Sequence, residues 1–280
     1  MEVFHSVLEL QNYLAKTASD SSVGFVPTMG ALHEGHLALV KKAISENKKT
    51  VVSIFVNPTQ FDKSEDLDNY PRTLEADVAL LSTISCDIVF APSVNEIYNE
   101  DVTARQFDFD GLENEMEGKH RKGHFDGVGT IVKRLFEIVQ PTRAYFGEKD
   151  FQQLQIIKKL VEKDQMDIEI VGCPIHREKD GLAMSSRNRR LTEEARSAAP
   201  FIYKLLKEAK KKFKNQSISA VEAWVEQQYL ANKQFDLEYF EIANATTLKS
   251  VQRKRKGAKY RAFVATYAGN IRLIDNIALN

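Results

Sequence analysis

The sequence predicts an α/β fold in which a parallel sheet is followed by a smaller α+β module. Short apolar runs alternate with stretches of helical periodicity from residue 23 to residue 171, which is the pattern of parallel strands joined by crossover helices. Polar loops follow several of these runs. Beyond Arg190 the pattern changes to helices followed by strands, which predicts the second module. A chain of 280 residues is long enough for one large and one smaller domain.

The predicted strands of the first domain are short and apolar. They cover residues 23–26, 51–56, 86–92, 144–146 and 168–171. An amphipathic helix over residues 7–14 precedes them, and further helices begin near residues 33, 74, 131 and 151. Because strand–helix–strand crossovers are right-handed, we expect the loops that follow these strands to share one edge of the sheet, where ligands bind in such folds.

Residues 107–117 are interpreted differently from the segments around them. They contain five acidic residues, so we expect an excursion that forms a solvated loop and carries no chemistry.

The second module is predicted to contain two helices and three strands. These cover residues 195–213 and 221–229, and then 237–243, 260–267 and 271–274. A basic cluster at residues 253–259 is a possible nucleic-acid patch. It lacks interleaved aromatic residues, however, so a solvated loop is the favoured interpretation.

Charge and cysteine content favour a small-molecule partner and a reducing compartment. Lys plus Arg and Asp plus Glu each number 39, so the chain has no global basic field for nucleic acid. Cys86 and Cys173, the only cysteines, are too few for a disulfide framework and lack metal-ligand spacing. Residues 1–14 lack the features of a signal peptide, and no run of about 18 apolar residues occurs, so we expect neither secretion nor membrane insertion.

The loop after the first apolar run carries the strongest chemical signal. Residues 27–36 are Pro-Thr-Met-Gly-Ala-Leu-His-Glu-Gly-His. If a helix begins near His33, the imidazoles of His33 and His36 project from the same face, where both can donate to one polyphosphate beside the amides of the helix start. Gly30 and Gly35 permit a sharp turn and close approach of a ligand. An isolated histidine at this place is more often an ordinary surface or core residue, but the combination favours phosphate binding.

Polar side chains also follow two other predicted strands. Gln60 can donate and accept hydrogen bonds at once, which suits a substrate with hydroxyl and carboxylate groups, although a turn-stabilising role explains this residue alone. In residues 147–150, Gly-Glu-Lys-Asp, the Lys149 ammonium suits a phosphate and Asp150 suits ribose hydroxyls. Gln153 lies on the first turn of the next helix. Each of these residues can equally be a simple cap.

Two further segments are rich in hydrogen-bond donors. Residues 121–130 place Arg121 and His124 at a helix entrance, which suits a bound carboxylate or polyphosphate and ordinary surface charge equally well. Residues 184–188, Met-Ser-Ser-Arg-Asn, follow a turn and offer hydroxyl, guanidinium and amide donors that can surround a triphosphate. Ser-Ser-Arg is common in loops, so its significance depends on its occurrence together with residues 27–36, the histidine loop.

These segments resemble motifs of known enzymes. The histidine loop and residues 184–187 resemble the H-x-G-H element and the mobile K-M-S-K-S-type loop of the nucleotidyltransferase superfamily. Taken together, the matched segments resemble, in the same order, those of the pantothenate synthetase (pantoate–β-alanine ligase) family; they are residues 27–36, 57–61, 121–128, 147–153 and 180–188. The resemblance implies a Rossmann-like domain over residues 1–188 that binds ATP and (R)-pantoate, a C-terminal α+β lid over residues 189–280, and a cytoplasmic homodimer. Mg²⁺ would accompany ATP.

The resemblance also implies roles for individual residues. The ATP-binding positions would be Met29, Gly30, Ala31, Leu32, His33, Glu34, Gly35, His36, Gly147, Glu148, Lys149, Asp150, His176, Met184, Ser185, Ser186 and Arg187. The catalytic positions among them would be His33, His36, Lys149, Ser185, Ser186 and Arg187, with His36 at the family's proton-donor position. Gln60 and Gln153 would hold pantoate. His176 stands where the family usually has a small aliphatic residue whose backbone contacts adenine.

The implied reaction joins pantoate and β-alanine through a pantoyl adenylate. Two alternatives share parts of the pattern. A synthetase acting on another acid or on transfer RNA would have both phosphate loops, but no anticodon-binding region is evident after residue 189. A non-catalytic nucleotide sensor would bind ATP without turnover. The presence of acid-binding candidates beside the phosphate loops favours the ligase.

Overall fold

The computed structural model of this protein describes residues 1–17, 21–61, 64–99 and 101–280. The chain divides into two compact units. The first comprises Met1–Glu148 and Gln153–Pro174, and the second comprises Lys149–Gln152 and Ile175–Asn280. The compact units divide between Pro174 and Ile175, whereas the boundary predicted for the ATP-binding and lid domains lies after residue 188. The assignment of binding and lid roles to these two domains stays a prediction.

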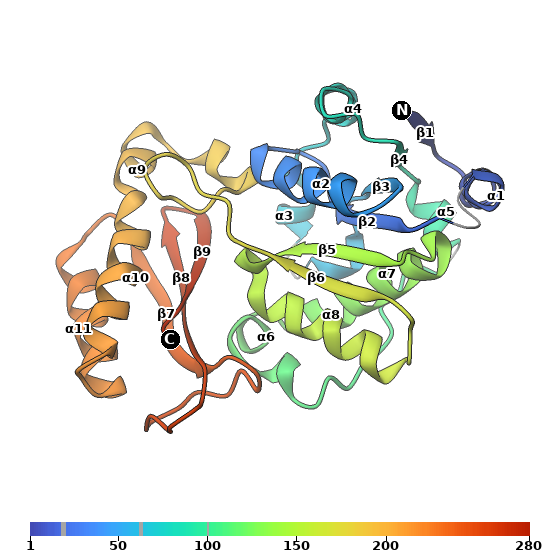
Figure 1. Ribbon diagram of the computed structural model, residues 1–280. Coiled ribbons are helices and arrows are strands. Elements are labelled where there is room, and N and C mark those ends of the chain that lie inside the picture. The colour runs from blue at the N-terminus through green and yellow to red at the C-terminus, as the bar shows by residue number, and fades with distance from the viewer. Residues whose placement is uncertain (18–20, 62–63, 100) are drawn as a thin grey trace. The chain divides into compact units, whose positions relative to one another are not determined.

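A six-stranded, all-parallel sheet forms the centre of the first unit (Figure 1). Its spatial order is β1-β4-β3-β2-β5-β6. The strands are β1 (Glu2–Phe4), β2 (Val23–Thr28), β3 (Lys49–Ile54), β4 (Ile88–Phe90), β5 (Arg143–Gly147) and β6 (Glu169–Cys173). The predicted α/β class is confirmed. The strand order also reverses at β2, which has β3 on one side and β5 on the other, and such a switch point is where α/β sheets bind ligands.

Helices cover both faces of this sheet, which is why its strands are largely apolar. Successive strand residues point to opposite faces. Phe25 therefore contacts Phe136, with ring centroids 6.2 Å apart, whereas Val26 packs in a cluster with Leu37 and Val40. The helices of this part of the chain are α1 (Val7–Thr17), α2 (Glu34–Glu46), α3 (Ser64–Asp68), α4 (Leu74–Ser82), α5 (Val94–Tyr98), α6 (Met116–His120), α7 (His124–Val139) and α8 (Phe151–Lys163). None of the helices in the described ranges is long and apolar enough to cross a membrane.

The interpretation of residues 107–117 as a solvated loop is wrong. Phe109, Leu112 and Met116 are 1%, 7% and 1% exposed, and a short 3-10 turn, η2 (Leu112–Asn114), lies between them. Asp108 and Asp110 are exposed and pair with the ammonium of a lysine on α8 at 3.0 and 2.6 Å. The segment is therefore anchored by buried apolar residues, while Asp108 and Asp110 are exposed and Glu117 is itself buried at 9% exposure.

The second unit is the predicted α+β module. Its antiparallel sheet has the order β7-β8-β9, with β7 (Asp236–Asn244), β8 (Tyr260–Ala268) and β9 (Ile271–Ala278). The helices are α9 (Glu193–Ala198), α10 (Pro200–Phe213) and α11 (Ile218–Ala231). The single helix predicted over residues 195–213 is wrong: it divides at Ala199, because Pro200 has no amide hydrogen to donate and starts a new helix.

Candidate active site

The histidine loop connects the end of β2 to the start of α2. His33 is the residue before the first helical residue, and its backbone N–H donates to His36 Nδ1 at 3.3 Å. The two imidazoles stack, with centroids 4.0 Å apart and planes 29° apart. Their predicted proximity is confirmed. The pair lies at the N-terminus of a 13-residue helix, where the helix dipole and backbone amides favour an anion.

A buried carboxylate that the sequence analysis missed holds this loop. Asp77 of α4 is 3% exposed, and its two oxygens accept the backbone N–H groups of Ala31 at 2.9 Å and Leu32 at 2.7 Å. The hydroxyl of Thr73 donates to the same carboxylate at 3.2 Å. At Gly30, with φ +82°, a Cβ would lie 3.0 Å from Asp77 Oδ2, so a larger residue would displace the carboxylate. The available signal was the position of Asp77 four residues before Leu81, which places this acid on the apolar face of the helix.

Gln60 lies beside the histidine loop in the turn η1 (Pro58–Gln60) that follows β3. Its side-chain amide donates to Met29 Sδ at 3.0 Å. Its Oε1 accepts from Asn57, which is 1% exposed and also accepts from the Tyr98 hydroxyl at 2.6 Å. The structure therefore brings together the predicted residues Met29 and Gln60, which come from different loops. Asn57, at the centre of this network, was missed as a supporting residue.

The basic entrance of α7 supports the same turn. His124 Nδ1 lies 2.8 Å from the backbone oxygen of Gln60, and Arg121 lies 3.1 Å from the other ring nitrogen of His124. Gly127 permits this packing, because a Cβ there would lie 2.2 Å from the carbonyl oxygen of Thr59. The sequence left two interpretations open for Arg121 and His124, namely ligand binding and ordinary surface charge. The geometry indicates a third role, in which they position Gln60.

The second unit holds the remaining basic and hydroxyl candidates. Lys149 lies in the turn η3 (Glu148–Asp150), where its carbonyl accepts the side-chain N–H of Asn276 at 2.9 Å and its ammonium lies 3.7 Å from Asp150. Ser186 is 9% exposed and begins the turn η4 (Ser186–Arg190). Ser185 caps the start of this turn, because its Oγ accepts the backbone N–H of Arg187 at 3.3 Å.

His176 lies in a hairpin formed by residues 176–184, which leads to Ser185 and Ser186. Its imidazole is exposed, and its carbonyl accepts the Met184 amide at 3.0 Å. The backbone oxygen at this position is thus engaged within the hairpin.

The predicted site residues consequently fall into two groups. Met29–His36, Gln60, Gly147, Glu148 and Gln153 belong to the first unit; Lys149, Asp150, His176 and Met184–Arg187 belong to the second. Among the described residues, no group of three or more His, Cys, Asp or Glu side chains could hold a metal ion.

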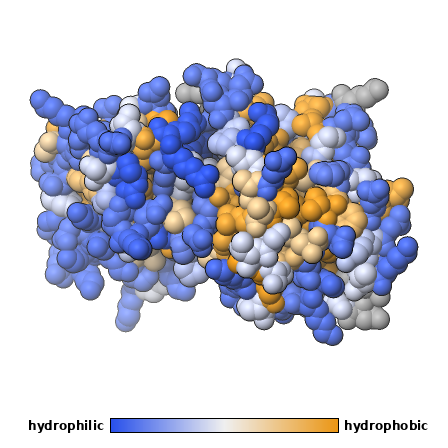
Figure 2. Space-filling view, turned by 90° about the horizontal axis from the view of Figure 1, so that it is seen from above, coloured by the Kyte–Doolittle hydropathy of each residue, from blue (hydrophilic) through white to orange (hydrophobic). Residues whose placement is uncertain are grey.

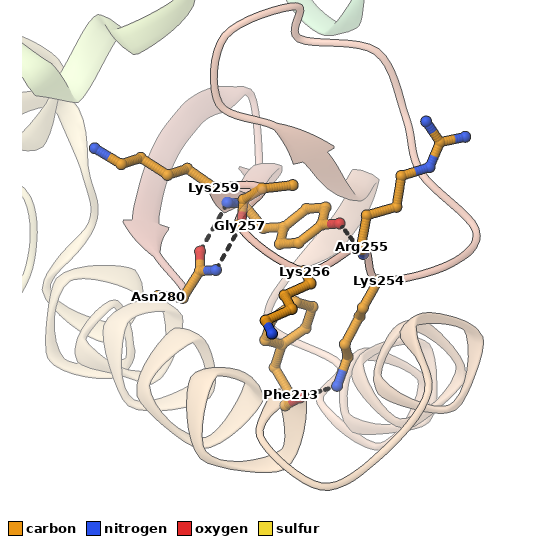
Figure 3. A pocket seen from close by; sticks show the side chains of 9 residues that line it. Phe213, Lys254, Arg255, Lys256, Gly257, Lys259 and Asn280 are labelled. Atoms are coloured by element: carbon orange, nitrogen blue, oxygen red, sulfur yellow. Dashed lines mark hydrogen bonds between the residues drawn. The ribbon is translucent and has the colours of Figure 1, made fainter.

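The basic cluster at residues 253–259 forms a separate surface pocket of about 550 Å³ in the second unit (Figure 3). Lys254 points to the carbonyl of Phe213 and lies 4.2 Å from the centre of its ring. Asn280 closes the loop by accepting from Tyr260 and donating to Ala258, both at 2.8 Å. The cluster is exposed as expected, and no predicted site residue lines this pocket.

The parallel sheet, with a paired-histidine loop at its switch point, is that of a nucleotide-binding α/β protein. The chain belongs to the pantoate–β-alanine ligase family, whose model matches residues 2–278.

Individual relatives agree with this assignment over the whole chain. Proteins named pantothenate synthetase from Christiangramia forsetii and Flavobacterium psychrophilum are 55% and 54% identical, with complete coverage of both chains in each comparison. The crystal structure of pantothenate synthetase from Thermus thermophilus has a TM-score of 0.92 at 43% identity, covering 100% of this chain and 99% of that one. A pantoate–β-alanine ligase from Francisella tularensis, described as complexed with β-γ ATP and β-alanine, has a TM-score of 0.83 at 35% identity, covering 100% and 98%.

We expect Asp77→Ala to loosen the histidine loop and to destabilise the protein by about 3–6 kcal/mol, because hydrogen bonds to a charged group contribute roughly 1.5–3 kcal/mol each and the variant leaves two loop amides without their acceptor. Hydrogen exchange should accelerate at residues 30–33, and urea unfolding should give the loss of stability. Glu75→Ala, which removes an exposed acid from the same helix, is the matched control. Unchanged exchange in Asp77→Ala would contradict the role given to this carboxylate.

Proposed function

We propose that this chain condenses (R)-pantoate with β-alanine to form pantothenate, through a pantoyl-adenylate intermediate and with conversion of ATP to AMP and pyrophosphate. The observation that carries the proposal is the paired-histidine loop at the switch point of a chain that matches the pantoate–β-alanine ligase family over residues 2–278. The named relatives, and the ATP and β-alanine described for the Francisella structure, support it.

The reaction proceeds in two displacements. A carboxylate oxygen of pantoate attacks the α-phosphorus of ATP, and the bond to the bridging oxygen breaks to release pyrophosphate. The amine of β-alanine then attacks the acyl carbon, the bond to AMP breaks, and the amine loses a proton. Neither step needs a covalent intermediate with the protein, so the work of catalysis is to position the reactants and stabilise phosphate charge.

The residues divide this work by their chemistry. His33 and His36 offer ring N–H donors at the start of α2, and His36 serves as the proton donor to the phosphates. Lys149 supplies a point charge, and Ser185, Ser186 and Arg187 supply hydroxyl and guanidinium donors for the leaving pyrophosphate. Gln60 and Gln153 bind pantoate. The residues that bind ATP are Met29–His36, Gly147–Asp150, His176 and Met184–Arg187.

Mg²⁺ enters this proposal with ATP rather than in a protein cage. The described residues contain no cluster of three His, Cys, Asp or Glu side chains, and Mg²⁺ is commonly bound through substrate phosphates with several waters retained. The basic and hydroxyl donors named above suit such a complex, because they bind phosphate oxygens that the ion leaves available.

Pyrophosphate exchange tests the function directly. With Mg²⁺ and without β-alanine, labelled pyrophosphate should enter ATP when pantoate is added, because adenylate formation is reversible. Exchange that requires another acid would overturn the substrate assignment. ATP binding with no exchange and no AMP production from any acid would favour a nucleotide sensor, and charging of transfer RNA would favour a synthetase.

We expect His36→Ala to lower the single-turnover rate of adenylate formation by ~10²-fold or more, the usual scale for removing one preorganised donor. Rapid-quench measurement of pantoyl adenylate would give this rate. His120→Ala, which removes an exposed histidine outside the two site groups, should retain the rate of the unaltered protein. A His36→Ala protein with undiminished adenylation would exclude the proton-donor role.

We further propose a cytoplasmic homodimer that binds neither nucleic acid nor membranes. The two cysteines are free and buried, which suits a reducing compartment. Most of the large apolar side chains that are exposed among the described residues belong to the first unit, and the face drawn in Figure 2 shows hydrophobic surface on that unit. These side chains are Met1, Val3, Leu8, Leu74, Val94 and Val102, with Leu230 in the second unit. Large apolar side chains exposed to water favour association with a second chain.

Sedimentation velocity should give a species of twice the chain mass of 31.8 kDa. The species should lose mass to the monomer value only on dilution. A single species of 31.8 kDa at all concentrations would contradict the dimer.

A further inference from the structure

Two adjacent polar residues lie buried in the middle of β9. Asp275 and Asn276 are 4% and 2% exposed. Burying a carboxylate or an amide is unfavourable unless its hydrogen bonds are satisfied. Both side chains are satisfied by segments of the second unit that also carry candidate phosphate-binding residues, which suggests that the pair has a role beyond the stability of the sheet.

Asp275 anchors the hairpin that leads to the serine–arginine turn. Its two oxygens accept from both terminal nitrogens of Arg177 at 2.6 and 2.8 Å. Arg177 also donates to the carbonyl of Gly181 at 3.0 Å, and its guanidinium lies 3.6 Å from the ring centre of Tyr203. Burial raises the pKa of the Asp275 carboxyl, while Arg177 favours the ionised form. The carboxylate therefore fixes a guanidinium that itself spans the hairpin.

The backbone contacts of the hairpin also fix the position of Met184 and the residues after it. Arg177 pairs with Ala183 in an antiparallel bridge, and the Met184 amide donates to the carbonyl of His176 at 3.0 Å. Leu182, 3% exposed, packs in the core of the same unit. Ser185 follows directly in the chain, so the start of the turn η4 is set by contacts that end at Asp275.

Asn276 anchors the other segment. Its side-chain N–H donates to the carbonyl of Lys149 at 2.9 Å, and its oxygen accepts from Arg261. The guanidinium of Arg261 lies 3.9 Å from the ring centre of Phe151, whose ring also contacts Phe263 of β8 with centroids 6.0 Å apart. Residues 149–152 consequently belong to the second unit, although β5 and most of α8 belong to the first.

We propose that Asp275 and Asn276 are positioning residues for adenylate formation, which hold Lys149 and the Ser185–Arg187 turn at a fixed spacing so that both engage the phosphates of ATP together. The inference rests on the proposed function. Consecutive strand residues point to opposite faces and their Cα atoms lie about 3.8 Å apart, so one peptide unit sets the separation of the two segments. A displacement of about 1 Å in such a constellation can lower a rate by ~10²-fold.

Asn276→Asp tests the tether to Lys149, because it keeps the size and the acceptor for Arg261 but replaces the N–H donor that faces the Lys149 carbonyl. We expect kcat for pantoate-dependent pyrophosphate exchange to fall by roughly 10- to 100-fold, with a smaller change in KM for ATP. In a Lys149→Ala background the same substitution should add little, because Asn276 acts through that lysine.

Asp275→Asn tests the other tether. It should lower kcat by a similar factor, and this loss should persist in the Lys149→Ala background because Asp275 acts through Arg177. Glu238→Gln is the matched control, because it removes a carboxylate that accepts from Arg272 at 2.9 Å between β7 and β9 of the same sheet. It should lower the melting temperature while leaving kcat unchanged.

The outcomes separate the inference from the function on which it rests. Pantoate-dependent exchange in the unaltered protein, with normal kcat in folded Asn276→Asp and Asp275→Asn proteins, would overturn the positioning role alone. Equal loss of kcat in Glu238→Gln would show that the effect is general destabilisation, and would also overturn it. Absence of exchange in the unaltered protein would overturn both proposals. If one of the two near-isosteric variants fails to fold by circular dichroism, the other variant decides.

Discussion

The conformation of the histidine loop depends on the buried carboxylate of Asp77. Ala31 has φ +50°, a left-handed conformation that costs a residue with a side chain about 1–2 kcal/mol. The two hydrogen bonds that Asp77 accepts from Ala31 and Leu32 contribute roughly 1.5–3 kcal/mol each, which exceeds that cost. These hydrogen bonds therefore set the shape of the loop, and His33 and His36 stack at the start of the helix that follows it. A site prepared in this way does not have to reorganise when charge develops on a phosphate.

In the second unit, buried polar side chains also hold loop segments in place, and they act on partners farther away in the sequence. Asp275 and Asn276 are polar residues buried in a strand, and each satisfies a group on a segment distant in sequence. In both units the supporting residues are almost fully buried, at 2–4% exposure, yet they determine where backbone and side-chain donors lie. Asn57 does the same for Gln60 in the turn after β3. Buried amides and carboxylates at these places thus connect the core to the loops.

The sequence contained enough information for the sheet but not for these supports. The five main strands are largely apolar because both faces are covered, and the proximity of His33 and His36 follows from their spacing of three residues at the start of one helix. Asp77 and Asn276, by contrast, act on residues 45 and 127 positions away, and only the fold brings those partners together. β1 has three residues and no periodicity to detect.

Two errors had visible causes in the sequence. Pro200 marked the division between α9 and α10, and it was outweighed by the helical periodicity around it. In residues 107–117 the five acids concealed the apolar residues placed between them, of which Phe109 and Met116 are almost fully buried. Charge at alternate positions describes one face of a segment and gives no information about the other.

The reaction that we propose uses no nucleophile from the protein, so its rate depends on the residues that position the reactants. Burial raises the pKa of the Cys86 and Cys173 thiols to about 11, so both are neutral near pH 7 and neither is suited to covalent catalysis. In the reaction that we propose, the rate then depends on how accurately donors are placed around the phosphates. Lys149 follows β5 in the chain, but its backbone is held by Asn276 of β9. The location of this charge is consequently determined by the second unit, together with that of Ser185, Ser186 and Arg187, and not by the strand that precedes it.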